Sequence, residues 1–197
     1  MKKINLICLI CSSSKMIKYY YPDVHFNNKV FSYYECSNCK SAQINPIPDD
    51  DDFNKMYGPI DHTYILKLND NEQINFNKPL PKYNHQKHQI DYLKKYKDNA
   101  FGKTMLDVGC GSGFYMYHAS ILGYICTGIE FNEEFCGILS KKTGFNITTI
   151  DKIKKEKYDV IHIGNFLEHM KDPAETLKSI KELAHKETIF NIDGPLE

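Results

Sequence analysis

The carboxyl-terminal half of the chain alternates between segments typical of β-strands and segments typical of α-helices, and this alternation restricts the fold more than any other feature. The strand-like segments are residues 104–108, 124–130, 145–150, 158–164 and 187–193. The helix-like segments are residues 113–123, 132–144 and 172–184. Asn132 and Asp172 are the expected N-caps of the two later helices. The pattern predicts an α/β fold with a doubly wound, mostly parallel sheet.

Four of the seven cysteines form two C-x-x-C pairs, Cys8 with Cys11 and Cys36 with Cys39. Two such pairs, separated by 24 residues, are typical of a tetrahedral zinc site with four thiolate ligands. Two segments, residues 19–26 and 29–36, are rich in β-formers, as expected of the strands of a small zinc ribbon. Because four protein ligands close the coordination shell, the Zn²⁺ would be structural. Four unrelated thiols and a redox-active disulfide pair are the alternatives.

The sequence divides into a zinc-ribbon-like head, a linker or lid, and a core, expected at residues 1–57, 58–82 and 83–197. Four aspartates at residues 49–52 fit a solvated turn or a helix N-terminus, and they lack the alternating spacing of calcium loops. The linker is polar and punctuated by proline. Ile90, Leu93 and Tyr96 recur at helical spacing, which predicts a helix over residues 82–98 leading into the core.

A glycine-rich loop follows the first core strand, in the stretch LDVGCGSGF. Its glycines are Gly109, Gly111 and Gly113, whereas the third glycine of a dinucleotide fingerprint would fall at position 114, which is Phe114. Glycines let the backbone approach a ligand closely. The loop therefore predicts a nucleotide-like ligand other than a dinucleotide, with a nicotinamide or flavin site as the alternative.

Two carboxylates flank this loop. Asp107 lies two residues before the first glycine, where a carboxylate suits a cationic group better than a phosphate. Glu130 ends the second core strand, where a carboxylate can accept hydrogen bonds from both hydroxyls of a ribose. S-adenosylmethionine carries an ammonium, a sulfonium and a ribose but no phosphate, so it fits this pattern. The alternative is a tight turn with a surface glutamate.

Three segments resemble class I S-adenosylmethionine-dependent methyltransferases. LDVGCGSGFYMYHASILGYICTGIEFN resembles the first two motifs of that superfamily. KYDVIHIGNFLEHMKDPAETLKSIKEL is similar to the strand-four segment of its small-molecule members that carry a Leu-Glu-His stretch. CLIC together with YYECSNCKSAQINPIPDDDDFNKMYG is similar to the zinc-binding head of some bacterial members, including sugar C-methyltransferases. The resemblance covers most of the chain except the linker and specifies no substrate.

The resemblance implies a cofactor site for S-adenosylmethionine. Residues 107–113 would contact the methionine end of the cofactor and Glu130 would bind its ribose. Phe131 would lie against the adenine, and Asp151 would lie near the adenine amine. The full expected cofactor-binding set is Asp107, Gly109, Cys110, Gly111, Gly113, Glu130, Phe131, Asp151, Asn165 and Phe166.

His169 is the candidate catalytic base, because it follows the fourth core strand at the ligand-binding side of the sheet and an imidazole titrates near neutral pH. The alternative is a histidine that only orders its loop, with Glu168 beside it. Some relatives bind a divalent metal through an upstream glutamate here. Asn165 takes that place, so no catalytic metal is expected. Weaker candidates for the cleft or the lid are His85, His88, Tyr57 and Tyr64.

The composition of the chain limits the classes of molecule that we expect it to bind. The formal net charge is zero and all 25 basic residues are lysine, which argues against a nucleic-acid substrate. The amino-terminal apolar run is short and lacks a small-residue cleavage site, and no stretch approaches the roughly 20 apolar residues that span a bilayer. We therefore expect a cytoplasmic protein whose partner is a small-molecule methyl acceptor, without a membrane or nucleic-acid partner and with an unspecified oligomeric state.

Together, these features predict an S-adenosylmethionine-dependent methyltransferase. The acceptor atom would be an oxygen or a carbon of a small molecule, with a sugar or glycan precursor as one candidate. Class I cores usually have seven strands and this pattern has five, so we expect a Rossmann-like core truncated after strand five. The alternatives are a non-catalytic zinc-ribbon adaptor with a vestigial core, and a nicotinamide oxidoreductase.

Overall fold

The structure is a computed structural model that describes residues 6–57, 72–76, 91–95 and 100–194. The chain divides into two compact units. One contains the described part of residues 1–61 together with 170–178, and the other contains the described part of 62–169 together with 179–197. We call residues 6–57 the head and residues 100–194 the core.

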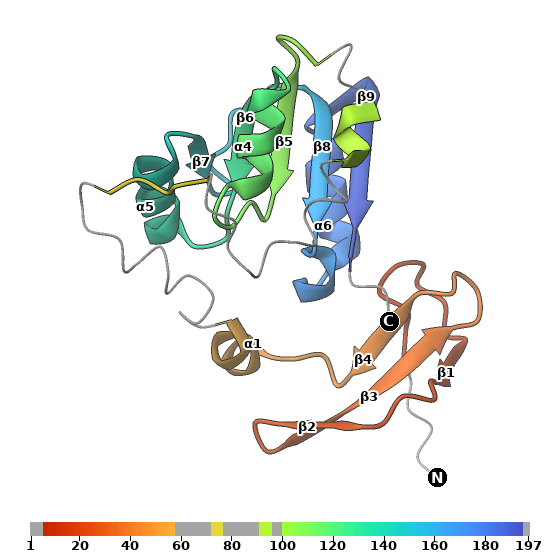
Figure 1. The fold of residues 1–197 in the computed structure, drawn as a ribbon. Helices are drawn as coiled ribbons and strands as arrows, with labels where there is room; N and C mark the ends of the chain where they lie inside the picture. Colours follow the sequence, from red (N-terminus) through yellow and green to blue (C-terminus); the bar gives the residue numbers. More distant parts are fainter. Residues whose placement is uncertain (1–5, 58–71, 77–90, 96–99, 195–197) are drawn as a thin grey trace. The chain divides into compact units, whose positions relative to one another are not determined.

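The head is built around a small antiparallel sheet (Figure 1). Its strands are β1 (Met16–Lys18), β2 (Val24–Phe26), β3 (Lys29–Cys36) and β4 (Ala42–Asn45). The long strand β3 pairs with each of the other three. Asn27 and Asn28 join β2 to β3 with φ angles of 51° and 58°. Two successive positive φ angles are typical of the type I′ turn that suits the twist of a hairpin, and asparagine tolerates them.

The aspartate run begins a helix, α1 (Asp50–Tyr57). The carboxylate of Asp49 accepts a hydrogen bond from the backbone N–H of Asp52, and the carboxylate of Asp52 accepts one from the N–H of Asp49, each at 3.0 Å. This reciprocal pair is a capping box. The Asp52 side chain is buried and accepts hydrogen bonds from Lys29 (2.7 Å) and Asn27 (2.6 Å), and the Lys29 bond lowers the pKa of Asp52. The ammonium of Lys29 thus offsets the negative charge of the buried Asp52 carboxylate.

The core contains a five-stranded sheet in which every pairing is parallel. Its strands are β5 (Thr104–Val108), β6 (Ile125–Ile129), β7 (Asn146–Thr148), β8 (Tyr158–Gly164) and β9 (Ala184–Asp193). The spatial order is β7-β6-β5-β8-β9. The chain runs outward from β5 to β7 and returns to the other side of β5, which confirms the predicted doubly wound α/β fold.

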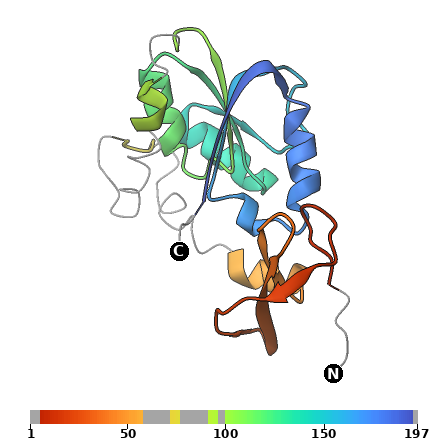
Figure 2. The ribbon, with the colours of Figure 1, turned by 90° about the vertical axis from the view of Figure 1, so that its right-hand side faces the viewer.

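Helices connect the strands and cover the sheet. They are α4 (Phe114–Ile121), α5 (Glu133–Thr143) and α6 (Pro173–Lys181). The helices α4 and α5 share one buried apolar cluster with β5, β6 and β7, which includes Met105, Met116 and Leu139. Figure 2 shows the core sheet and the helices α4 and α5 from a second direction. The expected caps are present, because Asn132 accepts a hydrogen bond from Phe135 N at 3.0 Å and Asp172 accepts one from Glu175 N at 2.9 Å.

One predicted boundary was wrong. The helix expected to run to residue 184 ends at Lys181, and β9 starts at Ala184 rather than at residue 187. Tyr158 N donates a hydrogen bond to Leu183 O at 3.0 Å, and Tyr158 pairs with Ala184. The start of β8 therefore draws this segment into the sheet, and pairing across strands outweighs the local helical preference.

Several expected features lie outside the described residues. These are most of the linker or lid at 58–82, most of the leading helix at 82–98, the residues His85, His88 and Tyr64, and the side chain of Tyr57. The short described pieces pack into the core. Ile74 and Leu93 are buried in the apolar cluster, and the ring of Phe76 stacks on Tyr117 with centroids 4.5 Å apart.

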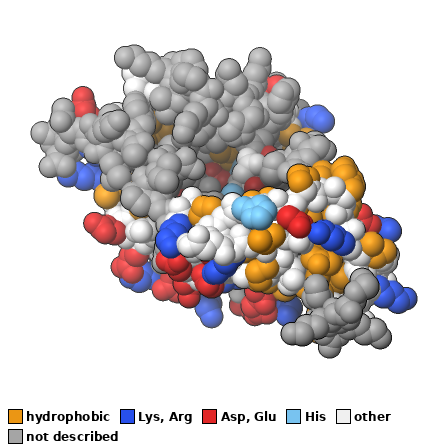
Figure 3. All heavy atoms as spheres, turned by 90° about the horizontal axis from the view of Figure 1, so that it is seen from below, with side chains coloured by type: hydrophobic (Ala, Val, Ile, Leu, Met, Phe, Trp, Pro, Cys, Tyr) orange, Lys and Arg blue, Asp and Glu red, His pale blue; other side chains and the backbone are white. Residues whose placement is uncertain are grey.

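No helix among the described residues combines the length and apolar character needed to cross a bilayer. Figure 3 shows one face of the molecule, on which lysine and acidic side chains of the described residues are interspersed and the lysines form no continuous patch.

Candidate functional site

The glycine loop connects β5 to α4 and is shaped by neighbours on two sides. The N–H groups of Gly109 and Cys110 both donate to the carbonyl of Ile129, at 2.8 and 3.0 Å, which ties the loop to the end of β6. Gly109 has a φ of 75°, and a Cβ at this position would lie 2.5 Å from Cδ2 of Phe166. Both observations require glycine at residue 109. The structure therefore brings together two expected cofactor residues, Gly109 and Phe166.

The remaining residues of the loop differ in their exposure. Cys110 is buried and its Sγ lies 2.6 Å from where a Cβ on Gly128 would stand, so its thiol points into the core and only its backbone can face a ligand. Burial raises the pKa of this thiol. Gly111 has a φ of 48°, and no atom of the described residues lies within 4 Å of where its Cβ would stand. Gly113, with a φ of 74°, is the N-cap of α4. The backbone around Gly111 is thus accessible to a ligand.

Glu130 and Phe131 follow β6 at its carboxyl end. Glu130 N donates to Thr148 O on β7 at 3.0 Å, and the Glu130 carboxylate accepts a hydrogen bond from Phe131 N at 2.7 Å. The side chain of Phe131 is 81% exposed. A carboxylate and an exposed aromatic ring therefore stand beside each other at the end of the strand next to the glycine loop.

Asp151 is exposed and lies in the turn after β7. It lines a cavity of about 600 Å³ together with residues of the segment leading into β8 and of the end of α6, such as Lys155 and Glu182. None of the other expected cofactor residues lines this cavity. The structure thus brings Asp151 to a hollow that is separate from the glycine loop.

The end of β8 carries the remaining expected residues. Asn165 has a φ of 47°, which asparagine tolerates better than most residues, and its N–H donates to Asp193 O at 3.1 Å. A short 3₁₀ turn follows at Leu167–His169. The His169 ring is 38% exposed and its Nε2 lies 3.8 Å from the Glu168 carboxylate. This geometry leaves the imidazole partly open to solvent beside an acidic group.

A buried charged cluster crosses the centre of the sheet, and it was not predicted from the sequence. His162 on β8 stands in register beside Asp107 on β5. Its Nδ1 lies 2.8 Å from Asp107 Oδ1, and its Nε2 lies 3.2 Å from Asp193 Oδ1 on β9. The side chains of Asp107 and His162 are 3% and 4% exposed. The one local signal was a histidine between two isoleucines of this strand, since a buried ionisable group requires a partner.

Tyr115 of α4 covers the imidazole of His162. The two rings are stacked with centroids 3.7 Å apart and an interplanar angle of 19°. Asn191 Nδ2 donates to the hydroxyl of Tyr115 at 3.0 Å. Burial raises the pKa of Tyr115. Burial alone would lower the pKa of His162, but the two carboxylates outweigh it and raise this pKa to about 9. The imidazole is therefore charged at neutral pH.

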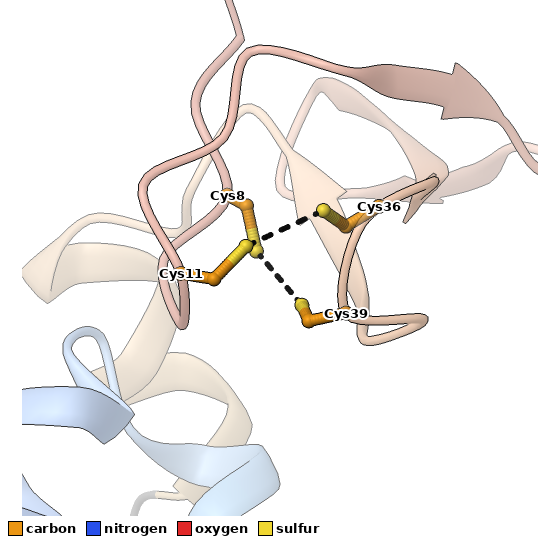
Figure 4. Close-up of side chains that lie close together, drawn as sticks. All are labelled: Cys8, Cys11, Cys36 and Cys39. Atoms are coloured by element: carbon orange, nitrogen blue, oxygen red, sulfur yellow. Dashed lines mark hydrogen bonds between the residues drawn. The ribbon is translucent and has the colours of Figure 1, made fainter.

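The four cysteines of the head converge on one point (Figure 4). Their Sγ atoms all lie within 4.8 Å of one another. The Cys8–Cys39 and Cys11–Cys36 sulfur pairs are each 3.6 Å apart. Ligands 2.3 Å from a central zinc ion would be separated by about 3.8 Å in a tetrahedron, whereas a disulfide requires about 2.05 Å. The donor set and spacing therefore fit a four-coordinate metal ion.

The two cysteine knuckles share one backbone geometry. In the first, Cys8 N donates to Ser13 O and Ser12 N donates to Cys8 O, both at 2.9 Å. The second repeats this pattern at the same distances, from Cys36 N to Ser41 O and from Lys40 N to Cys36 O. Each turn thereby presents two sulfurs on the same side, which is what a tetrahedral site requires.

Hydrogen bonds also favour the thiolate form of one cysteine in the cluster, and a thiolate is the form that binds a cation. Burial opposes ionisation of Cys8, but hydrogen bonds with the Ser41 hydroxyl and the backbone of Cys11 and Ile10 outweigh this effect. The net result lowers the pKa of the Cys8 thiol to about 6. Thiolates rather than thiols bind metal, so this environment favours the ligand form.

The curated relatives of this chain are methyltransferases. Ubiquinone biosynthesis O-methyltransferase from Proteus mirabilis (strain HI4320) is 31% identical over 116 residues, a match that covers 54% of this chain and 46% of that protein. The protein of the same name from Actinobacillus pleuropneumoniae serotype 5b (strain L20) is 33% identical over 109 residues, covering 48% of this chain and 47% of that protein. The chain thus spans about half the length of the curated relatives it matches.

Solved structures that resemble part of this chain include a methyltransferase. Magnesium protoporphyrin IX methyltransferase from Synechocystis PCC 6803 with bound SAM is 18% identical to this chain, with a TM-score of 0.49. The match covers 71% of this chain and 74% of that chain. A family model described as a methyltransferase domain matches residues 83–196, more than half of the 197 residues. With this match and the parallel sheet described above, the chain belongs to the methyltransferase domain family.

Proposed function

We propose that this chain binds S-adenosylmethionine at the carboxyl ends of β5, β6 and β8 and transfers its methyl group to an oxygen or carbon atom of a small molecule. Membership of the methyltransferase family implies this cofactor. The observation that carries the proposal is the pairing of an accessible glycine backbone at Gly111 with the Glu130 carboxylate at the end of the adjacent strand. A backbone that a ligand can approach and an acceptor for ribose hydroxyls are the two features such a cofactor needs.

Each residue group has a distinct role in this proposal. The loop at residues 107–113 binds the methionine end of the cofactor, and Glu130 accepts hydrogen bonds from the ribose. The exposed ring of Phe131 packs on the adenine. Asp151, which was expected at the adenine amine, lines the separate hollow after β7 and has no contact with the cofactor in this proposal. Asn165 and Phe166 line the pocket opposite the loop, which agrees with the contact between Phe166 and the position of Gly109.

The bound cofactor supplies an electrophilic methyl group on a sulfonium, whose positive charge is lost as the methyl leaves. The residues of the chain fix the geometry of the reacting groups and remove the proton of the acceptor. Gly109 and Phe166 fix the loop against β8, and a fixed geometry supplies much of the rate of an in-line displacement. His169 removes the proton of the acceptor as a general base, with Glu168 beside it to orient the imidazole.

The acceptor is proposed as a small molecule because the curated relatives are named as O-methyltransferases of ubiquinone biosynthesis. Those names favour an oxygen over a carbon as the reacting atom. A hydroxyl acceptor must lose its proton as its oxygen attacks the methyl group, which agrees with the place given to His169.

We further propose that Cys8, Cys11, Cys36 and Cys39 bind one structural Zn²⁺. The spacing of the sulfurs and the repeated knuckle geometry support this role. A head of this size buries too little apolar surface to be stable alone, so the metal supplies the stability that its core lacks.

Calorimetric titration with S-adenosylhomocysteine tests the cofactor site. We expect wild-type protein to bind, and Glu130→Ala to weaken binding at least about tenfold, because a charged hydrogen bond to the ribose is lost. Glu134→Gln is the matched control, since Glu134 is an exposed glutamate four residues away, in α5. Absence of binding by the wild-type chain would refute the proposal and favour the adaptor. Binding of NADH in its place would favour an oxidoreductase.

A further inference from the structure

The charged cluster of Asp107, His162 and Asp193 extends the proposed cofactor site below the glycine loop. Asp107 lies two residues before Gly109, yet its side chain is only 3% exposed. A buried carboxylate is costly unless a hydrogen-bonding partner stabilises it. Its described partner is His162 Nδ1, at 2.8 Å. The orientation of the Asp107 carboxylate therefore depends on the imidazole.

The imidazole itself is fixed from several sides. Asp193 holds Nε2 at 3.2 Å from the side of β9, and Tyr115 covers one face of the ring from α4. A Cβ at Gly164 would lie 2.6 Å from Cε1 of His162, so the glycine at this position leaves room for the ring. A ring held by three elements cannot rotate freely, and it holds Asp107 in one orientation.

The charges of the cluster sum to one negative unit. The imidazolium of His162 lies between two carboxylates, and the interaction keeps it protonated at neutral pH. Two carboxylates without it would place two like charges within one sheet, at a cost in free energy. The cluster thus keeps one net negative charge at the end of β5, which complements a single cationic group on a ligand.

We propose that His162 is a positioning residue of the cofactor site, which orients the carboxylate of Asp107 toward the ammonium of the cofactor's aminoacyl end. This inference rests on the proposed function, because it assumes that the glycine loop binds S-adenosylmethionine. The loop and the cluster form one packed structure, since Tyr115 follows Gly113 by two residues and Asn191 binds its hydroxyl.

A pair of substitutions separates positioning from a general structural role. In His162→Asn the side-chain amide can donate from the place of Nδ1 and still reach Asp107. In His162→Gln the longer side chain carries its amide near the place of Nε2, toward Asp193 and away from Asp107. Both variants are polar and uncharged, so they differ mainly in which carboxylate they can hold.

The probes are S-adenosylhomocysteine, which carries the aminoacyl ammonium, and 5′-methylthioadenosine, which lacks it. We expect His162→Gln to lower the affinity for S-adenosylhomocysteine about tenfold, whereas the affinity for 5′-methylthioadenosine should change less than about twofold. His162→Asn should restore most of the lost affinity. His185→Asn is the control, because His185 forms a similar pair with Asp159, at 3.4 Å, near the opposite end of β9.

An equal loss of affinity for both ligands in His162→Gln would overturn the inference. Equal ligand affinities of His162→Asn and His162→Gln would overturn it as well. A wild-type chain that binds neither ligand would instead refute the proposed function, and the inference with it. If wild-type protein binds both ligands and only the preference for the aminoacyl group depends on residue 162, the positioning role is established.

Discussion

Gly109 shows how much of the loop geometry depends on one residue. Its φ of 75° lies in the left-handed region, and Phe166 occupies the space that a Cβ would need. A side chain would strain the backbone and displace the aromatic ring together. The path of the loop is therefore fixed by the absence of a single carbon atom.

Gly109→Ala should destabilise the core by about 1–3 kcal/mol, because the left-handed conformation and the contact with Phe166 both oppose a methyl group. It should also weaken S-adenosylhomocysteine binding. Urea unfolding and calorimetry measure the two effects. Gly137→Ala is the matched control in α5, where a Cβ would meet open space, and should stabilise by about 0.5–1 kcal/mol. A Gly109→Ala protein as stable as wild type would contradict the explanation.

His162 makes the stability of the core depend on pH. Its pKa rises from the ordinary 6.5 to about 9 in the folded protein. A raised pKa contributes stability that is fully present below pH 6.5 and is lost as the pH rises through 9. We expect this contribution to be at most about 3 kcal/mol.

The measurement is the free energy of unfolding from pH 6 to about pH 9.5, for wild type and for His162→Asn. The wild-type value should fall across this window more steeply than that of the variant. Cysteine ionisation in the head affects both proteins equally, so the difference between the curves isolates residue 162. Parallel curves would show that the imidazole is not preferentially charged in the folded state.

At the scale of elements, α1 depends on its capping box. Asp52→Ala removes the acceptor for Asp49 N and leaves the half-buried amine of Lys29 and amide of Asn27 without this carboxylate. Loss of a cap of this kind should lower the melting midpoint of the head by about 5 °C. Asp50→Ala is the control, because its side chain is 91% exposed. Circular dichroism follows the melting, and equal midpoints for the two variants would contradict the assignment.

The elements of the core could be predicted because their signals are local. The strands β5, β6 and β8 are apolar runs, and Asn132 and Asp172 mark helix starts by their own side chains. The strands β1 and β4 were missed, since strands of three or four residues form only through pairing with β3. The early start of β9 was missed for the same reason.

The residues of the candidate site also differ in whether they could be predicted from local sequence. The glycine loop and Glu130 could be recognised from adjacent residues in the sequence. The partners of Asp107 could not, because its contact with His162 spans 55 residues and depends on the order β5-β8-β9 in the sheet. A sequence pattern gives strands but not which strands become neighbours, so the charged cluster became visible only in three dimensions.

At the scale of the whole molecule, the chain joins a unit with a four-cysteine cluster to a unit with an apolar core. The proposed zinc predicts one equivalent of metal per chain by mass spectrometry. Removal with a chelator should abolish amide-exchange protection in β1 to β4 while β5 to β9 stay protected. Cys36→Ser should lose the metal, and Cys126→Ser, a thiol of the core, should retain it. Full metal retention by Cys36→Ser would contradict the four-thiolate site.

The positions of the four thiols also set an order of events during translation. All of them lie within the first 39 residues, and about 65 residues separate Cys39 from Thr104, where the first core strand begins. At about 5–20 residues per second, the ribosome needs about 3–13 s to synthesise this interval. On the proposed zinc site, a nascent chain can therefore acquire its ion while the polypeptide that will form the core sheet is still being made. The cellular supply of metal would then act on this chain before the core is folded.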